Sequence, residues 1–289
     1  MQYQGTIYRP PSEAHSILLQ VTTGCSHNKC SFCGMYKGQR FAIKSEEQIL
    51  ADIDYASAHF PSARRLFLCD GDALILPQER LLTLLKRIES RLPQINRVGI
   101  YANTKSLQSK SITELQRLHS HGLGIVYMGL ESGDDVTLAG MNKGATTGQM
   151  IEMGKKAKLA GIQLSVTVLL GIAGPERSGI HAVATGRVLT ALDPEYVGAL
   201  SLMLEPGTAL YAEYQAGRFA LPEALALLQE LRTMLATTTL SQGLFHANHA
   251  SNYLPIRAKL PEEKTETLAL LDQALAGKLT LKPEYLRAL

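Results

Sequence analysis

Short apolar segments alternate with amphipathic segments along most of this chain, and this alternation limits the possible folds more than any other feature. The segments between the apolar runs carry apolar side chains at helical spacing, as in residues 78–92. Such alternation is the signature of parallel βαβ units. Six apolar runs have the length of buried strands: residues 17–21, 66–69, 98–101, 125–130, 164–170 and 196–204.

Helices are expected wherever the apolar spacing is helical. Ser45 is a suitable N-cap for the first of them, with Gln48 at the capping-box position, and Gly161 is suited to end the fourth. The expected helices begin at residue 46 and then cover 78–92, 111–121, 146–160, 179–191, 220–240 and 262–276.

Six βα units are too few to close an eight-fold barrel. They can form either a doubly wound open sheet or an open, three-quarter barrel. In both cases functional groups are expected at the carboxyl ends of the strands. We expect a core over residues 1–215, and a helical C-terminal extension that includes a lid over residues 216–289.

Three of the four cysteines lie in the loop after the first strand, in the sequence Cys25-Ser-His-Asn-Lys-Cys30-Ser-Phe-Cys33. Closely spaced thiolates are a metal-ligand set that suits iron–sulfur clusters, zinc or copper(I). A cubane cluster usually takes four cysteines, so three would leave one iron with an open position. A Cys3His zinc site that includes His27 is the alternative. A disulfide framework is not expected, because the chain is long and its cysteines are few.

The composition is that of an ordinary globular protein, with 45% hydrophobic and 19% charged residues. The net charge of +3 does not by itself decide about nucleic acid, but no basic face is evident and no nucleic-acid partner is expected. No apolar run approaches the roughly 20 residues of a membrane span, so no membrane partner is expected. The N-terminus has no export signal, and a cytoplasmic location follows as the expectation.

The cysteine loop resembles the cluster-binding loop of the radical S-adenosylmethionine (SAM) superfamily, and Phe32 before the last cysteine fits that pattern. The spacing is C-x4-C-x2-C instead of the usual C-x3-C-x2-C. The resemblance covers about residues 15–210 and implies a partial barrel of six βα units. It also implies a [4Fe-4S] cluster held by Cys25, Cys30 and Cys33, with SAM chelated to the remaining iron.

Polar residues at the ends of the expected strands strengthen this resemblance. Glu131 and Lys143 follow the fourth strand, where the branch similar to oxygen-independent coproporphyrinogen oxidases, elongator-type enzymes and methylthiotransferases has a Gln or Glu and an Arg. A lysine can meet the SAM carboxylate as a point charge but lacks the fork of arginine. The resemblance implies further SAM-binding residues at Asp70, Gly71, Asp72, Tyr101, Asn103, Ser165, Thr167 and Gly171.

Several of these residues also have a purely structural interpretation. Asp70 and Asp72 can cap the next helix, and Cys69 is the kind of small residue that packs in a core. The segment 245–253 is rich in hydrogen-bonding side chains and is expected to fold over the open end of the barrel, with His246, His249 and Asn252 as substrate-binding candidates. A solvated loop is the alternative there.

Taken together, the residues and the resemblance imply a radical SAM enzyme. It would reductively cleave SAM to a 5′-deoxyadenosyl radical, modify a small-molecule or cofactor-type substrate, and receive electrons from a donor such as flavodoxin or ferredoxin. A second hypothesis is a radical SAM enzyme that modifies tRNA or a protein. A third is a non-enzymatic module that binds zinc or an iron–sulfur cluster.

Overall fold

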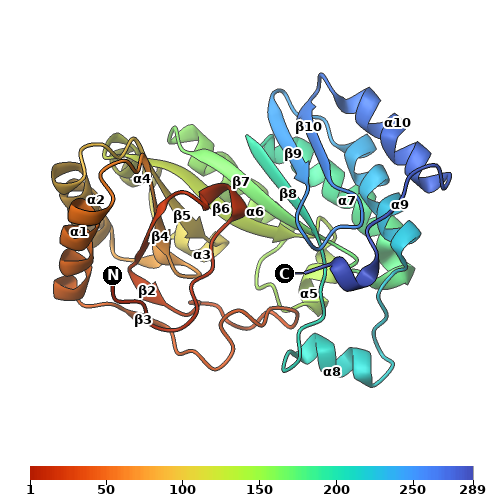
Figure 1. Ribbon diagram of the computed structural model, residues 1–289, viewed down its shortest axis with the longest axis horizontal. Coiled ribbons are helices and arrows are strands. Elements are labelled where there is room, and N and C mark those ends of the chain that lie inside the picture. Colours follow the sequence, from red (N-terminus) through yellow and green to blue (C-terminus); the bar gives the residue numbers. More distant parts are fainter. Residues whose placement is uncertain (289) are drawn as a thin grey trace. The chain divides into compact units, whose positions relative to one another are not determined.

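The computed structural model describes residues 1–288 and has a mostly parallel sheet of eight strands, which confirms the expected α/β class (Figure 1). The strand order is β1-β4-β5-β6-β7-β8-β9-β10, and β2 and β3 form a separate antiparallel ribbon. The strands are β1 (Ile17–Gln20), β2 (Thr22–Thr23), β3 (Ala42–Ile43), β4 (Arg65–Cys69), β5 (Arg97–Ala102), β6 (Leu123–Glu131), β7 (Gln163–Leu170), β8 (Tyr196–Ser201), β9 (Gly243–Ala247) and β10 (Ile256–Leu260).

All seven expected helices are present. Three more, α3, α5 and α8, have only five to seven residues, too few to show an apolar stripe in the sequence. The helices are α1 (Glu46–His59), α2 (Gln78–Arg91), α3 (Thr104–Gln108), α4 (Ile112–Ser120), α5 (Asp135–Gly140), α6 (Thr147–Leu159), α7 (Gly174–Leu192), α8 (Ala209–Gln215), α9 (Ala224–Thr237) and α10 (Lys264–Leu275), with 3-10 turns at Pro11–Glu13, Ala73–Ile75 and Glu284–Leu286.

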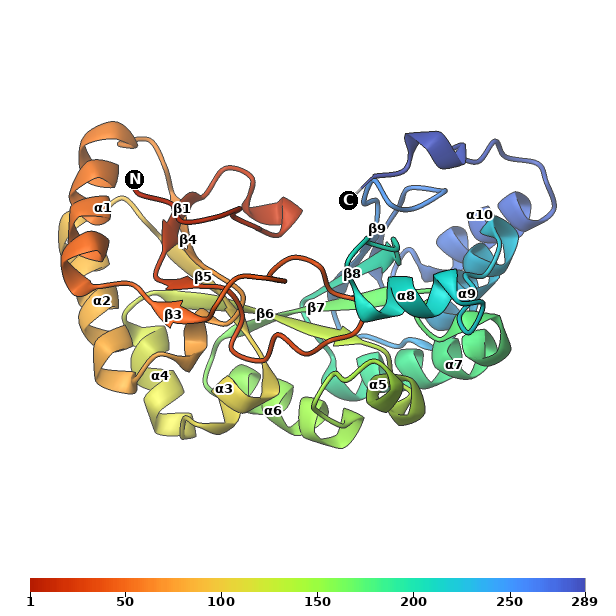
Figure 2. The ribbon, with the colours of Figure 1, turned by 90° about the horizontal axis from the view of Figure 1, so that it is seen from below.

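The chain divides into two compact units. The first contains residues 1–28, 35–128 and 153–164, and the second contains residues 29–34, 129–152 and 165–289. In the first unit, β4 pairs in parallel with β1 and β5. Helices α1 and α2 lie side by side next to these strands (Figure 2). As expected, the hydroxyl of Ser45 caps α1 by accepting a hydrogen bond from Gln48 N.

In the second unit, β9 lies between β8, to which it is parallel, and β10, to which it is antiparallel (Figure 1). Residues 245–247, expected in a polar lid, therefore belong to a strand inside the sheet. The reason is apolar burial, because Phe245 and Ala247 are fully buried within this strand. The segment after residue 215 thus adds two strands to the sheet as well as helices.

Helix α9 packs against α7 on one side and α10 on the other. The approach of α7 to α9 depends on Gly186. A Cβ added there would lie 2.7 Å from Cβ of Thr237 and 2.8 Å from the carbonyl oxygen of Met234, both closer than real Cβ contacts. Gly179 on the same helix is exposed and has open space around it.

This difference between two glycines of one helix gives a stability prediction. Gly186→Ala should lower the free energy of unfolding by about 1–3 kcal/mol, because the two helices must move apart. Gly179→Ala should raise it by about 0.4–1 kcal/mol, because alanine reduces the entropy of the unfolded chain. Denaturant unfolding of both variants provides the test. Equal effects would show that the helix contact does not depend on Gly186.

Candidate functional site

In the first unit, the turn after β4 lies against the start of the cysteine loop. A Cβ added to Gly71 would lie 3.0 Å from Cβ of Cys25 and 2.7 Å from Cε2 of Tyr36. Only glycine therefore lets the cysteine and the tyrosine ring approach this backbone so closely. The structure thus brings together Cys25 and the Asp70-Gly71-Asp72 turn, both of which the sequence singled out.

Asp72, the last residue of this turn, is held by hydrogen bonds through one carboxylate oxygen only. Its Oδ2 accepts hydrogen bonds from the hydroxyl of Ser26 and from Asn103 Nδ2, the latter at 2.8 Å. Its Oδ1 is buried and has no hydrogen-bond partner within residues 1–288. Burial raises the pKa of Asp72, against hydrogen bonds that lower it. One carboxylate oxygen is thus positioned by the protein and the other is left as a buried acceptor.

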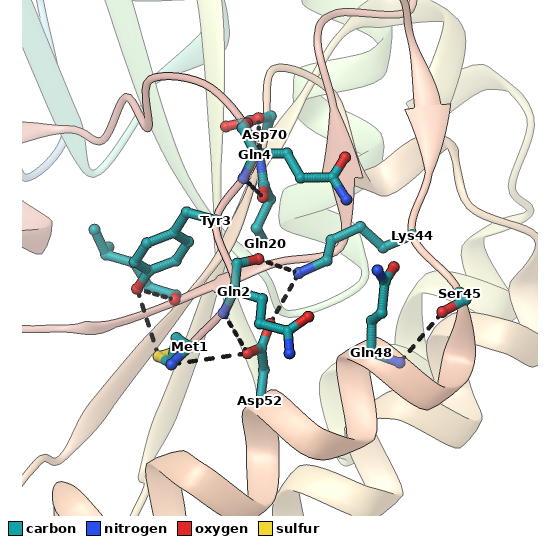
Figure 3. Close-up of polar contacts among 11 residues, drawn as sticks. Met1, Gln2, Tyr3, Gln4, Gln20, Lys44, Ser45, Gln48, Asp52 and Asp70 are labelled. Carbon is teal, nitrogen blue, oxygen red and sulfur yellow. Dashed lines mark hydrogen bonds and ion pairs between the residues drawn. The ribbon is translucent and has the colours of Figure 1, made fainter.

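Asp70 is held from below by Gln20, which the sequence analysis missed (Figure 3). Gln20 Nε2 donates to Asp70 Oδ2 at 2.8 Å and to the carbonyl of Gln4, whose N–H donates to Gln20 Oε1. Burial raises the pKa of Asp70 to about 6, while the Gln20 hydrogen bond and the charge of Lys44 oppose the rise. Asp70 is therefore part of a buried scaffold under the turn.

This scaffold continues to a buried ion pair, shown in Figure 3. Lys44 Nζ lies 2.8 Å from Asp52 Oδ2, and both side chains are almost fully buried. Lys44 also donates to the carbonyl of Gln2, whose own N–H donates to Asp52 Oδ1 at 2.7 Å. The first residues of the chain are thereby fastened to α1, close to the residues that support Asp70.

Tyr101 lies in an aromatic cluster of the same unit. Its ring meets Phe67 edge-on, with 4.9 Å between ring centroids, and Tyr127 at 6.2 Å. Asn103 next to it caps α3 through a complete capping box with Ser106. Asn103 therefore fixes the start of a helix and at the same time positions Asp72.

In the second unit, Glu131 and Lys143 form an ion pair, with 2.7 Å between Glu131 Oε1 and Lys143 Nζ. A Cβ at Gly129 would lie only 2.1 Å from Glu131 Oε1 and 2.8 Å from Lys143 Nζ, so the pair depends on this glycine. Glu131 itself has φ +63°, in the left-handed region that costs a non-glycine residue energy. Strain of this kind is common at functional sites.

Lys143 also lies within electrostatic range of two cysteines. Burial lowers its pKa, but the carboxylate of Glu131 and the negative charges of Cys30 and Cys33 outweigh this, so that the pKa lies above its ordinary value. The structure therefore places a firmly protonated lysine beside the two cysteines. In the sequence, only the resemblance to a known superfamily connected Glu131 and Lys143 with Cys30 and Cys33.

The second part of the cysteine loop is fastened to this unit by backbone and apolar contacts. Ser31 N donates to the carbonyl of Met141, and the carbonyl of Ser31 accepts from Leu210 N at 2.9 Å. Phe32 packs against the buried side chains of Ile172, Leu202 and Leu210. Phe32 thus anchors the loop between two cysteines.

Glu205, after β8, is a further residue of this region that the sequence analysis missed. A Cβ at Gly34 would lie 1.7 Å from Glu205 Oε2, so the carboxylate lies directly on the backbone after Cys33. Its position just beyond a strand end is the one signal that could have identified it.

Buried polar side chains also hold the ends of β6 and β7. Ser132 Oγ and His181 Nδ1 are 2.7 Å apart, and His181 Nε2 lies 3.4 Å from Glu230 Oε1. The same Glu230 oxygen accepts from Gly171 N at 2.7 Å, and its other oxygen accepts from Ser178. His181 and Glu230 could not be identified from the sequence, because each looks like an ordinary helix residue until the helices pack.

The remaining candidates lie on β7, β9 and the following turn. Ser165 and Thr167 are half-buried on alternate positions of β7. Asn252 is buried, accepts from the hydroxyl of Ser201, and donates to the carbonyls of Ala199 and Ala247. His249 Nδ1 accepts from Ser251 N. The contacts of Asn252 fasten the turn after β9 to the sheet.

The donor set suits an iron–sulfur cluster. Among residues 1–288, no three His, Cys, Asp or Glu side chains converge closely enough to hold one metal ion. A cubane does not require such convergence, because each cysteine binds a different iron. In the first unit, the buried, unpartnered Asp72 Oδ1 is suited to accept from an amino group. In the second unit, the cation of Lys143 is suited to a carboxylate.

Comparison with known proteins identifies a family. The family model described as the Radical SAM superfamily matches residues 19–184. No curated protein matches the sequence significantly. Of the described helices, none has the length and apolar character needed to cross a membrane.

Several solved structures share the fold. Coproporphyrinogen III oxidase (HemN) from Escherichia coli is 14% identical, with a TM-score of 0.57 over 86% of this chain and 56% of that one. Methylornithine synthase (PylB) is 17% identical, with a TM-score of 0.55 over 78% and 63%. The radical SAM methyltransferase TsrM from Kitasatospora setae, with cobalamin and a [4Fe-4S] cluster bound, is 18% identical, with a TM-score of 0.56 over 70% and 37%. These likenesses confirm the partial-barrel fold class, and the chain spans between about a third and two thirds of each protein's length.

The buried contacts of Glu230 give a prediction for this region. Glu230→Ala should lower the free energy of unfolding by about 2–5 kcal/mol, because it leaves the buried N–H of Gly171 and the half-buried hydroxyl of Ser178 without an acceptor. Gln229→Ala, at the exposed neighbouring position, should change it by less than about 0.5 kcal/mol. Urea unfolding of both variants measures the difference. A loss below 1 kcal/mol in Glu230→Ala would show that these donors find other partners.

Proposed function

Because the chain belongs to the radical SAM superfamily, we propose that it is an enzyme that binds a [4Fe-4S] cluster and SAM in order to modify a small-molecule or cofactor-type substrate. The observation that carries this proposal is the Glu131–Lys143 pair beside Cys30 and Cys33. When bound and reduced, the cluster would supply the electron for cleavage of the C–S bond of SAM, the chemistry that yields methionine and a 5′-deoxyadenosyl radical.

Eight of the candidate residues have defined tasks under this proposal. Cys25, Cys30 and Cys33 would hold the cluster, which with three cysteine ligands would keep one position open for SAM. Lys143 attracts the SAM carboxylate, and Glu131 keeps the lysine ammonium in place. The free oxygen of Asp72 accepts a hydrogen bond from the SAM amino group. Gly71 leaves room for Cys25, and Gly171, whose N–H is held by Glu230, fixes the loop after β7.

The proposal includes partners and location. The cluster needs a one-electron donor such as flavodoxin or ferredoxin, and a reducing compartment such as the cytoplasm protects it from oxygen. Modification of tRNA or of a protein is the second candidate function. The net charge of +3 provides no specific support for it, because a dedicated nucleic-acid binder concentrates basic residues on one face.

The cysteines provide the first test. Cys25→Ala, Cys30→Ala and Cys33→Ala should each abolish the iron content and SAM cleavage, because two thiolates cannot hold a cubane. Cys69→Ala is the control, since Cys69 is fully buried and burial raises the pKa of its thiol. It should keep about four irons per chain. Loss of iron in this control would make Cys69 a fourth ligand and remove the open iron position.

The SAM-binding residues provide the second test. Asp72→Asn and Lys143→Met should keep the iron but weaken SAM binding about ten- to a hundredfold, because a charged hydrogen bond contributes about 1.5–3 kcal/mol. Arg232→Gln is a control, because this residue of α9 pairs with Asp272 of α10, and neither helix carries a SAM candidate. Equilibrium binding of SAM to the iron-loaded protein measures the effect. Unchanged affinity in both test variants would mean that other residues hold SAM.

A further inference from the structure

The strands of the second unit present two different faces. On β7, β8 and β9, residues at alternate positions are buried, whereas those between them are half-buried. On β10, Ile256, Ala258 and Leu260 are buried, while Arg257 and Lys259 are exposed. Because side chains alternate across a strand, the less buried residues share one face of the sheet.

Four residues of this face form a row across the strands. Thr167 on β7 is the register partner of Gly198 on β8, and Gly198 is the partner of His246 on β9. His246 is in turn the partner of Arg257 on β10. The four strands lie side by side in Figure 1. Neighbouring strands are about 4.8 Å apart, so Thr167 and His246 lie about 10 Å apart across Gly198.

Gly198 leaves free space in the middle of this row. A Cβ added there would meet only Cδ1 of Leu200, at an ordinary contact distance of 3.7 Å. Glycine in the interior of a strand is unfavourable unless another group approaches the backbone closely. No protein group within the described residues makes that approach, so the position has room for atoms of a ligand.

Polar groups beside this space lack partners. His246 Nε2 is buried and has no hydrogen-bond partner among residues 1–288. Within these described residues, the side chain of Arg257 makes no hydrogen bond or ion pair, whereas that of Lys259 on the same face is paired with Glu262 at 3.0 Å. Burial lowers the pKa of His246, and the charge of Arg257 lowers it further. The row therefore carries an uncompensated positive charge next to a buried ring nitrogen.

Protection of the sheet edge explains only part of this arrangement. Exposed charges on an edge strand such as β10 prevent pairing with other chains, and Arg257 and Lys259 both serve that purpose. Edge protection does not require a buried, unpartnered histidine nitrogen on the neighbouring strand. It also does not require a glycine beyond that histidine. Both features fit a bound oxyanion, which accepts hydrogen bonds from guanidinium and imidazole groups.

We propose that His246 and Arg257 form a subsite over Gly198 for an oxyanion, a carboxylate or a phosphate, of the small-molecule substrate. Arg257 provides the charge, His246 donates from its ring, and Thr167 contributes a hydroxyl on the other side of Gly198. This inference rests on the proposed function only in identifying the ligand as the substrate. It narrows the substrate class to small molecules that carry an acidic group.

The subsite is tested by direct binding, without SAM. The iron-loaded protein with isotope-labelled histidines is titrated with succinate and, separately, with inorganic phosphate, at constant ionic strength set by chloride. The ring signals of His246, assigned with His246→Gln, should shift saturably with at least one of the two probes. The probe that binds more tightly identifies the acidic group.

Two variants of β10 distinguish a specific anion site from general electrostatic attraction of anions to the basic residues of this strand. Arg257→Gln should weaken binding of the probe at least fivefold, and Lys259→Gln should leave it unchanged. Absence of a saturable shift with both probes, or equal weakening in both variants, would overturn the proposal. A protein that binds the probe but does not cleave SAM would contradict the proposed function and leave the subsite standing. SAM cleavage without probe binding would overturn the subsite alone.

Discussion

The cost of burying charge determines how the strand ends of this protein are built. A carboxylate or ammonium group removed from water is unfavourable unless other polar groups surround it. Accordingly, Asp70 is held by Gln20, Asp72 by Asn103, and Lys143 by Glu131. The main exceptions are single atoms, such as Oδ1 of Asp72, and these are the atoms to which a ligand can bind. Polar groups with one side satisfied and one side open are what a preorganised binding site requires.

Glycines have a second, equally physical role in these sites. Gly71 lets Cys25 approach the turn after β4, and Gly129 leaves room for the ion pair of Glu131 and Lys143. Gly198 leaves the space over which the oxyanion is proposed to bind. In the first two cases a methyl group would collide with the functional side chains. The role of these glycines is therefore steric: the absence of a Cβ leaves space for neighbouring groups. Their conformational freedom alone does not explain this role.

Much of the fold could be predicted from local sequence patterns, and part of the site from its position at strand ends. Helix α2 has a clear helical periodicity, strand β4 is a short apolar run, and Glu131 lies at a strand end that Lys143 follows. Gln20, His181 and Glu230 could not be found in this way, because their partners lie about 50 residues away in sequence. Strand β9 was mistaken for a loop because only five residues form it, among them a histidine.

The most direct test of the account is a single reaction with anaerobically purified, iron-loaded protein. Reduced with dithionite and supplied with SAM, it should release methionine and 5′-deoxyadenosine, and the protein should absorb broadly near about 400 nm with roughly four irons per chain. A colourless protein that holds one zinc ion and leaves SAM intact would contradict the account. It would make the cysteine loop a structural metal site.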